Sequence, residues 1–427
     1  MDLLAGRRGG PPRQKNMRQS QLFYQTKKEV PKDIEAISHK LLYRADLIDQ
    51  LGSGIYSFLP LGWLVHQKIA QVIREEMLKI GGQEVFLPTL HPKALWQKSG
   101  RWEDMNPPLY KLKDSHKKDF ALGSTHEEVM SKIAKERVSS YKDLPFALFQ
   151  FQTKFRNELR YTGGLLRTRE FVMKDLYSFH ADQKDFEKYY EQAAKSYLKI
   201  FKRCGLSAVR VKASGVGFTS SFTDEFQALT PVGEDSVVYC PKCDFAQNKE
   251  IAQYKAGTKC PQCGTQLKQE KGIEIGNIFP LGTKYSKAFN LYFTDQKGKK
   301  QLVIMASYGI GVGRLLATIV ETHHDKDGII WPKEVAPYLV HLVPIEVEKK
   351  KAEKIYQDLQ KQGIEVLYDD REGISPGQKL TESDLLGIPY RLVISKKTLK
   401  SGSLELKERA KKQAKLVKIN KLSIIKF

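Results

Sequence analysis

The sequence is poor in cysteine, has no long apolar run and carries too few acidic residues to balance its basic ones. With five cysteines among 427 residues and no secretory leader ahead of them, a disulfide framework is not expected. No stretch approaches the roughly 18 consecutive apolar residues that a membrane span requires, so we expect no membrane partner. The first residues hold two arginines and a Gly/Pro cluster, without an apolar stretch of signal-peptide length. We therefore expect a cytoplasmic protein in which residues 1–16 are a disordered extension or a misassigned start.

An excess of basic residues is the main compositional feature. Lys and Arg number 71 against 49 Asp and Glu, which gives a formal net charge of +22. Such a charge attracts polyanions and speeds encounters with nucleic acid, although a generally basic proteome would give the same balance. The 41% of hydrophobic residues is enough for ordinary buried cores, and the length allows two or three domains.

Hydrophobic periodicity predicts two long helices and a pair of strands before a separate α/β part begins. Apolar residues recur at helical spacing in residues 55–80 and 184–204. Alternation predicts strands at 146–156 and 168–179. From residue 335 onward strands and helices alternate, which is typical of an α/β domain with a mainly parallel sheet. Its strands are expected at 338–343, 364–368 and 390–394, and its helices at 346–361 and 376–386.

Four of the five cysteines form two CPxC knuckles. Cys240 and Cys243 form the first, and Cys260 and Cys263 form the second after sixteen intervening residues. Four thiolates at this spacing suit a tetrahedral Zn²⁺ ion with no open coordination position, so the predicted role is structural. The alternative is a relic ribbon whose cysteines stay reduced and empty. Cys204 is expected to serve packing.

A charged segment follows the first of the two predicted strands. It holds Arg156 and Glu158, then Arg167 and Phe171 after a loop, and Asp175. Charges among alternating apolar residues are costly unless they are paired or used. An arginine at a strand end can fork onto a phosphate, and an aromatic side chain on the neighbouring strand can stack on a base. A hairpin with cross-strand salt bridges would explain the same residues.

A glycine-rich turn, Ser307-Tyr-Gly-Ile-Gly-Val-Gly-Arg314, lies where a strand passes into a helix. Glycine lets the backbone come close to a ligand, and a helix N-terminus favours anions. Glycine-rich turns of this kind also occur for packing, so this segment alone leaves both interpretations open.

Together these segments resemble the three motifs of class II aminoacyl-tRNA synthetases. The Arg156–Asp175 segment is similar to motif 2, and GIGVGR is similar to motif 3. The long helix with the strand and Pro88 behind it resembles motif 1, which builds the dimer interface in that family. Further segments resemble prolyl-tRNA synthetases of bacterial type, from Met17 to the C-terminus. They are residues 17–48, GSGIYSFLPLG at 52–62, LGSTHEEV at 122–129, REFVMKDLYSFH at 169–180, KGIEIGNIFPLGTKYS at 271–286 and GIEVLYDDR at 363–371.

The resemblance implies an α+β protein that acts as a homodimer on proline, ATP with Mg²⁺ and tRNA(Pro), with no DNA partner. A class II catalytic domain, an antiparallel sheet flanked by helices, would carry a small zinc-ribbon-like insert and be followed by an α/β anticodon-binding domain. The implied boundaries are 17–235 and 271–334 for the catalytic domain, 236–270 for the insert and 335–427 for the anticodon-binding domain.

The resemblance also assigns the proline site. Thr125 and Glu127 match the TxE loop that holds the imino nitrogen of proline. A secondary ammonium offers two N–H donors, which a hydroxyl and a carboxylate can accept. The same residues would also suit a helix N-terminal cap with an acidic first turn. Phe179 and His180 are candidates for the pocket wall, although a buried structural histidine would give the same pattern.

The remaining catalytic residues are assigned to ATP. The resemblance implies that Arg156 binds the α-phosphate and the proline carboxylate, and that Glu158 contacts the adenine, on which Phe171 stacks. Arg314 would clamp the γ-phosphate, and Arg167 would meet the bent triphosphate tail.

Two departures from the family pattern are visible. Thr223-Asp224 stands where Ser-His is usual, while the following Gln227, a candidate ATP contact, is retained. Many bacterial members carry an editing domain of well over a hundred residues between motifs 2 and 3, for which residues 250–271 leave no room. In-chain hydrolysis of alanyl-tRNA is therefore not expected.

In the C-terminal domain the resemblance implies anticodon contacts. Arginine and carboxylates at strand ends can read splayed bases by their edges, but a solvated acidic loop would look the same. The candidates are Asp370, Arg371, Glu382, Asp384 and Arg409.

Two other functions compete with proline charging. Another class II specificity, such as threonyl, would share the C-terminal domain, but segments 169–180 and 271–286 argue against it. A non-catalytic tRNA-binding paralogue would have no reason to keep Arg156, Glu158 and Arg314 together.

Overall fold

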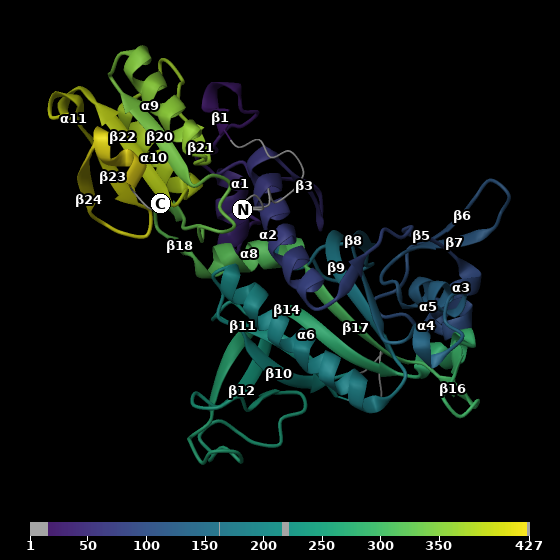
Figure 1. The fold of residues 1–427 in the computed structure, drawn as a ribbon. Coiled ribbons are helices and arrows are strands. Elements are labelled where there is room, and N and C mark those ends of the chain that lie inside the picture. Colours follow the sequence, from purple (N-terminus) through teal and green to yellow (C-terminus); the bar gives the residue numbers. More distant parts are fainter. Residues whose placement is uncertain (1–15, 162, 216–221, 425–427) are drawn as a thin grey trace, which may run out of the picture. The chain divides into compact units, whose positions relative to one another are not determined.

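A computed structural model describes residues 16–161, 163–215 and 222–424, so most of the predicted extension at 1–16 lies outside the described residues. The chain divides into two compact units (Figure 1). Among the described residues, the larger unit comprises 29–43 and 47–322, and the smaller comprises 16–28, 44–46 and 323–424. None of the described helices combines the length and the apolar character that crossing a membrane would take.

A nine-stranded, mostly antiparallel sheet forms the centre of the larger unit, in the order β11-β10-β13-β12-β14-β17-β9-β8-β4. Its strands are β4 (Gly82–Glu84), β8 (Phe146–Phe155), β9 (Glu170–His180), β10 (Val209–Ser214), β11 (Phe222–Leu229), β12 (Asp235–Tyr239), β13 (Ala246–Asn248), β14 (Lys268–Gly282) and β17 (Ile304–Gly311). The two strands predicted at 146–156 and 168–179 are β8 and β9, paired in antiparallel register from Phe146↔Phe179 to Phe155↔Glu170.

The helices of the larger unit pack on this sheet and on its surrounding loops. They are α1 (Ile37–Arg44), α2 (Pro60–Lys79), α3 (Lys93–Ser99), α4 (Arg101–Asp104), α5 (Glu127–Lys135), α6 (Gln183–Arg203), α7 (Lys284–Phe289) and α8 (Val312–Thr322). Small sheets add β2 (Ile48–Gly52), β3 (Ile55–Phe58), β5 (Leu90–Pro92), β6 (Lys111–Lys113), β7 (Asp119–Leu122), β15 (Tyr292–Thr294) and β16 (Lys300–Leu302).

The long helix α2 is shorter than predicted. Residues 55–58 form strand β3 of a hairpin with β2, and the helix begins at Pro60, a residue that suits the first helical turn. Its periodic apolar side chains are buried, among them Val65, Ile69 and Met77. The helix ends before Gly81, whose φ of +81° favours glycine.

The side chains of strand β9 point alternately to the two faces of the sheet. Lys174 contacts Met77 of α2 and Tyr197 of α6 on one face. Phe179 belongs to the core that the other face forms with α5 and α7, which includes Met130 and Tyr285. Successive side chains on a strand alternate between faces, so odd-numbered residues of β9 point away from α2 and α6.

In the smaller unit a six-stranded sheet runs in the order β1-β21-β20-β22-β23-β24. Strands β1, β21, β20 and β22 pair in parallel, and β23 and β24 each pair antiparallel to the strand before them in this order. The prediction of a mainly parallel sheet is confirmed. Its elements are β1 (Asn16–Arg18), β18 (His324–Asp325), β19 (Gly328–Ile329), β20 (Val340–Ile345), α9 (Lys349–Lys361), β21 (Val366–Tyr368), α10 (Pro376–Leu386), β22 (Tyr390–Ser395), α11 (Lys396–Lys400), β23 (Ser403–Glu408) and β24 (Ala414–Lys418).

Strand β1 was not anticipated. It adds an edge to this sheet, and the Arg18 guanidinium carbon lies 5.4 Å from the ring centres of both Tyr356 and Tyr368. The Gln19 side chain is buried against His341 at 2.9 Å. Residues 17–28 therefore group with the smaller unit, as do residues 323–334, whereas the predicted ranges 17–235 and 271–334 assign both segments to the catalytic domain.

Candidate active site

A cavity of about 300 Å³ opens over the strands β9, β14 and β17 of the larger unit. The odd-numbered residues of β9 that point away from α2 and α6 contribute to its floor. Seven residues predicted as ligands line it together, although they come from distant parts of the sequence: Thr125, Glu127, Arg156, Glu158, Arg167, Phe171 and Arg314. The structure thus brings the predicted proline loop and the predicted ATP residues into one space.

The loop before α5 presents a hydroxyl and a carboxylate to the cavity. The Thr125 hydroxyl donates to Glu127 Oε2 at 2.6 Å and lies 3.4 Å from the Tyr177 hydroxyl. Its oxygen has two lone pairs, so it can accept from a ligand even when Tyr177 donates to it. Helix α5 begins at Glu127, and no side chain caps its N-terminus. The cap interpretation therefore holds only for the acidic first turn, since Thr125 bonds a side chain and no helix amide.

A buried network holds this loop from below. The backbone N–H of His126 donates to the Tyr177 hydroxyl at 3.0 Å, and the His126 ring lies 2.7 Å from Lys154 Nζ and 3.1 Å from the Pro88 carbonyl. Lys154 also pairs with Asp175 at 2.8 Å. Burial, aided by the charge of Lys154, lowers the pKa of His126, so the ring is neutral, accepts from the lysine and donates to the carbonyl.

Two arginines and an aromatic ring line the cavity together. The Arg156 guanidinium carbon lies 5.2 Å from the centre of the Phe171 ring. Its Nε is buried and has no hydrogen-bond partner among the described residues. Burial and the charge of Arg314 lower the pKa of Arg156. Arg314 is held by the Leu166 carbonyl at 2.8 Å and by Glu274 at 3.3 Å. Two guanidinium groups that line one cavity favour a bound anion.

Two carboxylates that the sequence interpretation left unassigned share the cavity with these arginines, and one of them, Glu274, pairs with Arg314. Glu225 and Glu274 both line the cavity. Burial, together with the charge of Glu274, raises the pKa of Glu225 to about 8. Two neighbouring carboxylates whose charges repel in this way favour a bound cation. Glu274 lies within segment 271–286, which carries the family resemblance, and Glu225 follows Thr223-Asp224, where the sequence departs from the family pattern. The resemblance was the only available signal for them.

Three predicted ligands do not reach the cavity. Phe179 is buried and stacks on Phe146 with ring centres 4.5 Å apart. His180 is buried and bonds Asp185 at 2.6 Å, so the structural-histidine alternative describes it. Gln227 is buried and donates to Glu225 at 3.0 Å and Asp235 at 2.8 Å. Their roles in binding stay predictions without support from the geometry.

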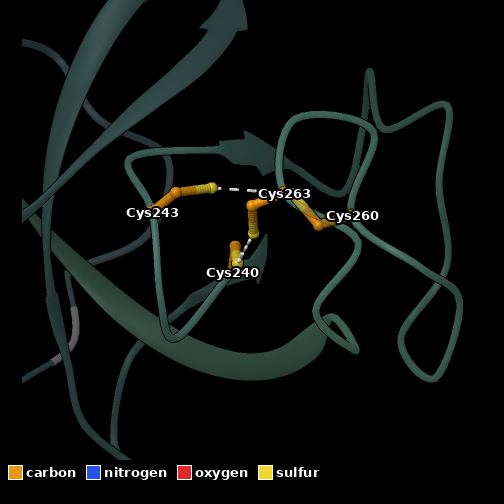
Figure 2. Close-up of side chains that lie close together, drawn as sticks. All are labelled: Cys240, Cys243, Cys260 and Cys263. Carbon is orange, nitrogen blue, oxygen red and sulfur yellow. Dashed lines mark hydrogen bonds between the residues drawn. The ribbon is translucent and has the colours of Figure 1, made fainter.

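The four paired cysteines converge at the end of the β12–β13 hairpin (Figure 2). Their sulfur atoms all lie within 4.8 Å of one another, with Cys240–Cys263 at 3.4 Å and Cys243–Cys260 at 3.6 Å. Four sulfurs at about 2.3 Å from one zinc ion would be separated by roughly 3.8 Å. The set therefore fits a tetrahedral metal with small adjustments. Cys204 is buried outside this group, as predicted.

In the smaller unit, Asp370 and Arg371 line a cavity of about 240 Å³. Both are already engaged: Asp370 accepts from Ser20 at 2.8 Å, and Arg371 pairs with Asp369 at 2.8 Å and Glu382 at 2.7 Å. The other three candidates, Glu382, Asp384 and Arg409, do not line this cavity. Arg409 makes a two-pronged ion pair with Asp325, and Asp384 pairs with Arg391 and Lys407.

The family models match this division of the chain. Residues 110–323 match the class II core domain of tRNA synthetases for G, H, P, S and T, and residues 339–424 match the anticodon-binding domain. The fold is also that of solved structures of prolyl-tRNA synthetase from Cryptosporidium parvum, with a TM-score of 0.74 at 21% and 19% identity, covering 90% of this chain and 75% of those chains. Fold and sequence together define a class II aminoacyl-tRNA synthetase.

Curated relatives narrow the class to one specificity. The chain is 34% identical to the proline–tRNA ligase of Moorella thermoacetica, covering 93% of this chain and 96% of the relative. It is 34% identical to that of Desulfitobacterium hafniense, covering 95% and 98%. The chain therefore belongs to the proline–tRNA ligase family, and the relatives favour proline over the threonyl and non-catalytic alternatives.

The same comparison shows that a large segment is missing here. The alignment with the Moorella protein runs over 549 positions, whereas this chain has 427 residues. More than a hundred positions of the relative therefore face gaps, in agreement with the predicted absence of the large insertion.

Proposed function

We propose that this chain activates proline with ATP to form prolyl adenylate and transfers the prolyl group to tRNA(Pro). One observation carries the proposal: the Thr125–Glu127 acceptor pair and the Arg156–Phe171–Arg314 group open into a single cavity. An imino acid and a nucleoside triphosphate bound to these two groups would meet at their reacting atoms.

Proline would enter with its secondary ammonium toward Thr125 and Glu127. The hydroxyl and carboxylate oxygens accept its two N–H donors. Arg156, with a buried Nε that has no partner among the described residues, would receive the carboxylate and the α-phosphate. Phe171 would stack on the adenine, Glu158 would contact its edge, and Arg314 and Arg167 would hold the phosphate tail.

The reaction then needs no nucleophilic side chain. The proline carboxylate attacks the α-phosphorus in line, the bond to the bridging oxygen breaks, and pyrophosphate leaves. The terminal tRNA hydroxyl next attacks the carbonyl carbon of the adenylate, and AMP leaves. Positioning and charge neutralisation by Arg156 and Arg314 supply the acceleration.

Glu225 and Glu274 are the residues that would hold Mg²⁺. Their oxygens face the cavity, and Mg²⁺ prefers one or two carboxylates together with phosphate oxygens. When bound, the ion neutralises charge on the triphosphate. The carboxyl pair fits this role because its own repulsion is relieved by a cation.

We also propose a structural Zn²⁺ on Cys240, Cys243, Cys260 and Cys263. Four thiolates leave no position for water or substrate, so the ion would hold together the ribbon beyond β12 and β13. This ribbon occupies the interval in which bacterial relatives carry their insertion.

The protein would work in the cytoplasm as a homodimer that binds tRNA through its anticodon-binding domain. The edge strand β4 and the exposed Phe86 beside it (80% exposed) favour a second copy as partner. The 240 Å³ cavity beside Asp370 and Arg371 is the favoured anticodon contact. Sedimentation analysis of wild type and Phe86→Glu would test the dimer, which a monomeric wild type would contradict.

Proline-dependent ATP–pyrophosphate exchange tests the whole proposal. Exchange should require proline when each standard amino acid is offered alone, apart from weaker exchange with alanine. Exchange that follows threonine, or none with any amino acid by folded protein, would contradict it.

A further inference from the structure

Arg101 lies directly behind the predicted proline ligand Glu127. Its Nη1 donates to Glu127 Oε2 at 3.1 Å, to Glu128 Oε1 at 3.1 Å and to the Tyr285 hydroxyl at 2.8 Å. Three helices, α4, α5 and α7, meet at this guanidinium. The side chains of Arg101, Glu127 and Glu128 are 7%, 2% and 0% exposed, so solvent screens these charges little.

The group carries two carboxylates, on adjacent residues in the first turn of α5, and one arginine on α4. Burial acts to lower the pKa of Arg101, but the charges of Glu128 and Glu127 raise it above its ordinary value. Burial and the charge of Glu127 raise the pKa of Glu128 despite the arginine. Two adjacent buried carboxylates without Arg101 would share a proton, because both cannot stay ionised in so little space.

The arginine also contacts a second residue that lines the cavity. Its Nη2 donates to Met105 Sδ at 3.1 Å, and Met105 lines the cavity together with Glu127. The guanidinium carbon lies 5.4 Å from the Trp96 ring and 5.7 Å from the Tyr285 ring. Arg101 is therefore fixed on several sides and has no freedom to follow a substrate, and it does not itself line the cavity.

We propose that Arg101 is a positioning residue for proline: it keeps Glu127 ionised and turned toward the cavity so that this carboxylate accepts the imino nitrogen of the substrate. The role rests on the proposed function, in which Glu127 binds proline. Arg101 contacts neither substrate, and its effect reaches proline only through Glu127. It should therefore influence the binding of proline and leave the binding of ATP unchanged.

Variants that change the net charge of Arg101, Glu127 and Glu128 test this role. Arg101→Met removes the guanidinium that bonds both buried carboxylates and leaves the charge of Lys284 acting on them. We expect the KM for proline to rise about ten- to a hundredfold while the KM for ATP stays within about twofold. In Arg101→Met/Glu128→Gln one carboxylate is neutral, so Glu127 regains a single full charge. This double variant should recover most of the lost proline affinity. Arg101→Lys, which keeps a cation without the planar fork, should fall between wild type and Arg101→Met.

Arg210 provides the matched control. It too bridges two carboxylates, Glu191 at 2.7 Å and Asp224 at 2.9 Å, but it does not line the cavity or touch Glu127. Arg210→Met should lower the melting temperature without moving either KM. Glu127→Gln tests the underlying function: normal proline kinetics in that variant would overturn the proposed proline site itself.

These variants distinguish a failure of the positioning role of Arg101 from a failure of the proposed function. If Glu127→Gln loses proline binding while folded Arg101→Met keeps a wild-type KM for proline, the positioning role is wrong and the proposed function stands. A double variant no better than Arg101→Met would equally overturn the charge argument. Should Arg101→Met fail to fold, Arg101→Lys and the double variant are compared with wild type instead. A wild-type KM for proline in Arg101→Lys, together with weak proline binding by the double variant, would count against the positioning role.

Discussion

Arg156 lies over Phe171, with the guanidinium carbon 5.2 Å from the ring centre, at the point where β8 ends and β9 begins. The distance is within the range of a cation–π contact, and the two residues flank a cavity that also receives Arg314. An adenine stacked on the ring would bring its phosphates past both arginines.

Removing either arginine should abolish measurable proline-dependent exchange in a folded protein. Arg156→Ala or Arg314→Ala removes one fixed charge at the transferring phosphate, and we expect a loss of roughly 3–4 kcal/mol in transition-state stabilisation, on the order of 10²–10³-fold. ATP–pyrophosphate exchange measures the loss. Arg210→Ala is the control, because Arg210 also lies over a tyrosine ring, at 5.9 Å from Tyr190, away from the cavity. Near-normal exchange by either variant would remove that arginine from the site.

The raised pKa of Glu225 predicts a pH-dependent need for magnesium. Its carboxyl has a pKa of about 8 because of burial and the charge of Glu274, so below that pH a bound cation must displace a proton. The Mg²⁺ concentration for half-maximal exchange should therefore fall as pH rises from 7 to 9. In Glu225→Gln the Mg²⁺ concentration for half-maximal exchange should be higher than in wild type and should vary less with pH. A requirement that stays flat across this range in wild type would contradict the assignment.

The cysteine group should bind about one zinc ion per chain. Metal analysis of protein expressed with zinc available tests this, and Cys240→Ser/Cys260→Ser is expected to lower the content to near zero. Because the ribbon is an insert joined to the sheet by β12 and β13, metal loss should unfold it locally and leave adenylate formation largely intact. Limited proteolysis should then cut between residues 240 and 263. Wild-type protein without zinc would count against the site.

Strands β8 and β9 could be predicted because apolar and polar residues alternate along them, but alternation does not say where a strand leaves the cavity. Phe171, Met173, Asp175 and Tyr177 share one face of β9 and line the cavity. Phe179 is on the same face and was expected there as well, yet at this point the strand has passed into the core. His180 has the opposite parity and faces α6, where it contacts Phe186.

The other features that the sequence did not predict have equally local causes. Gln227 has the parity of Glu225, but the pairing of β11 with β14 is irregular between Phe226 and Gln227, and its side chain turns to Asp235. Arg101 precedes its partner Glu127 by more than twenty residues, and no spacing rule links them. Strand β1 is three residues long, too short for any periodicity to reveal.

Replacement of Gly387 by alanine should destabilise the protein more than replacement of Gly402. Both residues have a left-handed backbone, with φ of +72° and +59°. A Cβ at Gly387 would lie 2.2 Å from the Ile329 carbonyl oxygen, whereas none of the described atoms lies within 4 Å of one at Gly402. Gly402→Ala should cost about 1–2 kcal/mol for the backbone conformation alone. Gly387→Ala should cost about 1–3 kcal/mol more, since backbone must move. Thermal unfolding of the two variants gives the comparison, and equal shifts would contradict the predicted clash.

The enzyme should form alanyl-tRNA and fail to clear it. Alanine is smaller than proline, and each missing methylene gives only about 1–3 kcal/mol of discrimination, so a second hydrolytic site is the usual remedy in this family. Here the interval that would hold it contains β13 and the cysteine ribbon, and more than a hundred positions of the Moorella relative face gaps. A metal bound by four thiolates cannot activate water. Preformed alanyl-tRNA for proline, incubated with the enzyme, should therefore deacylate at the rate seen without enzyme. Faster hydrolysis that survives replacement of the four cysteines would place an editing site elsewhere in the chain.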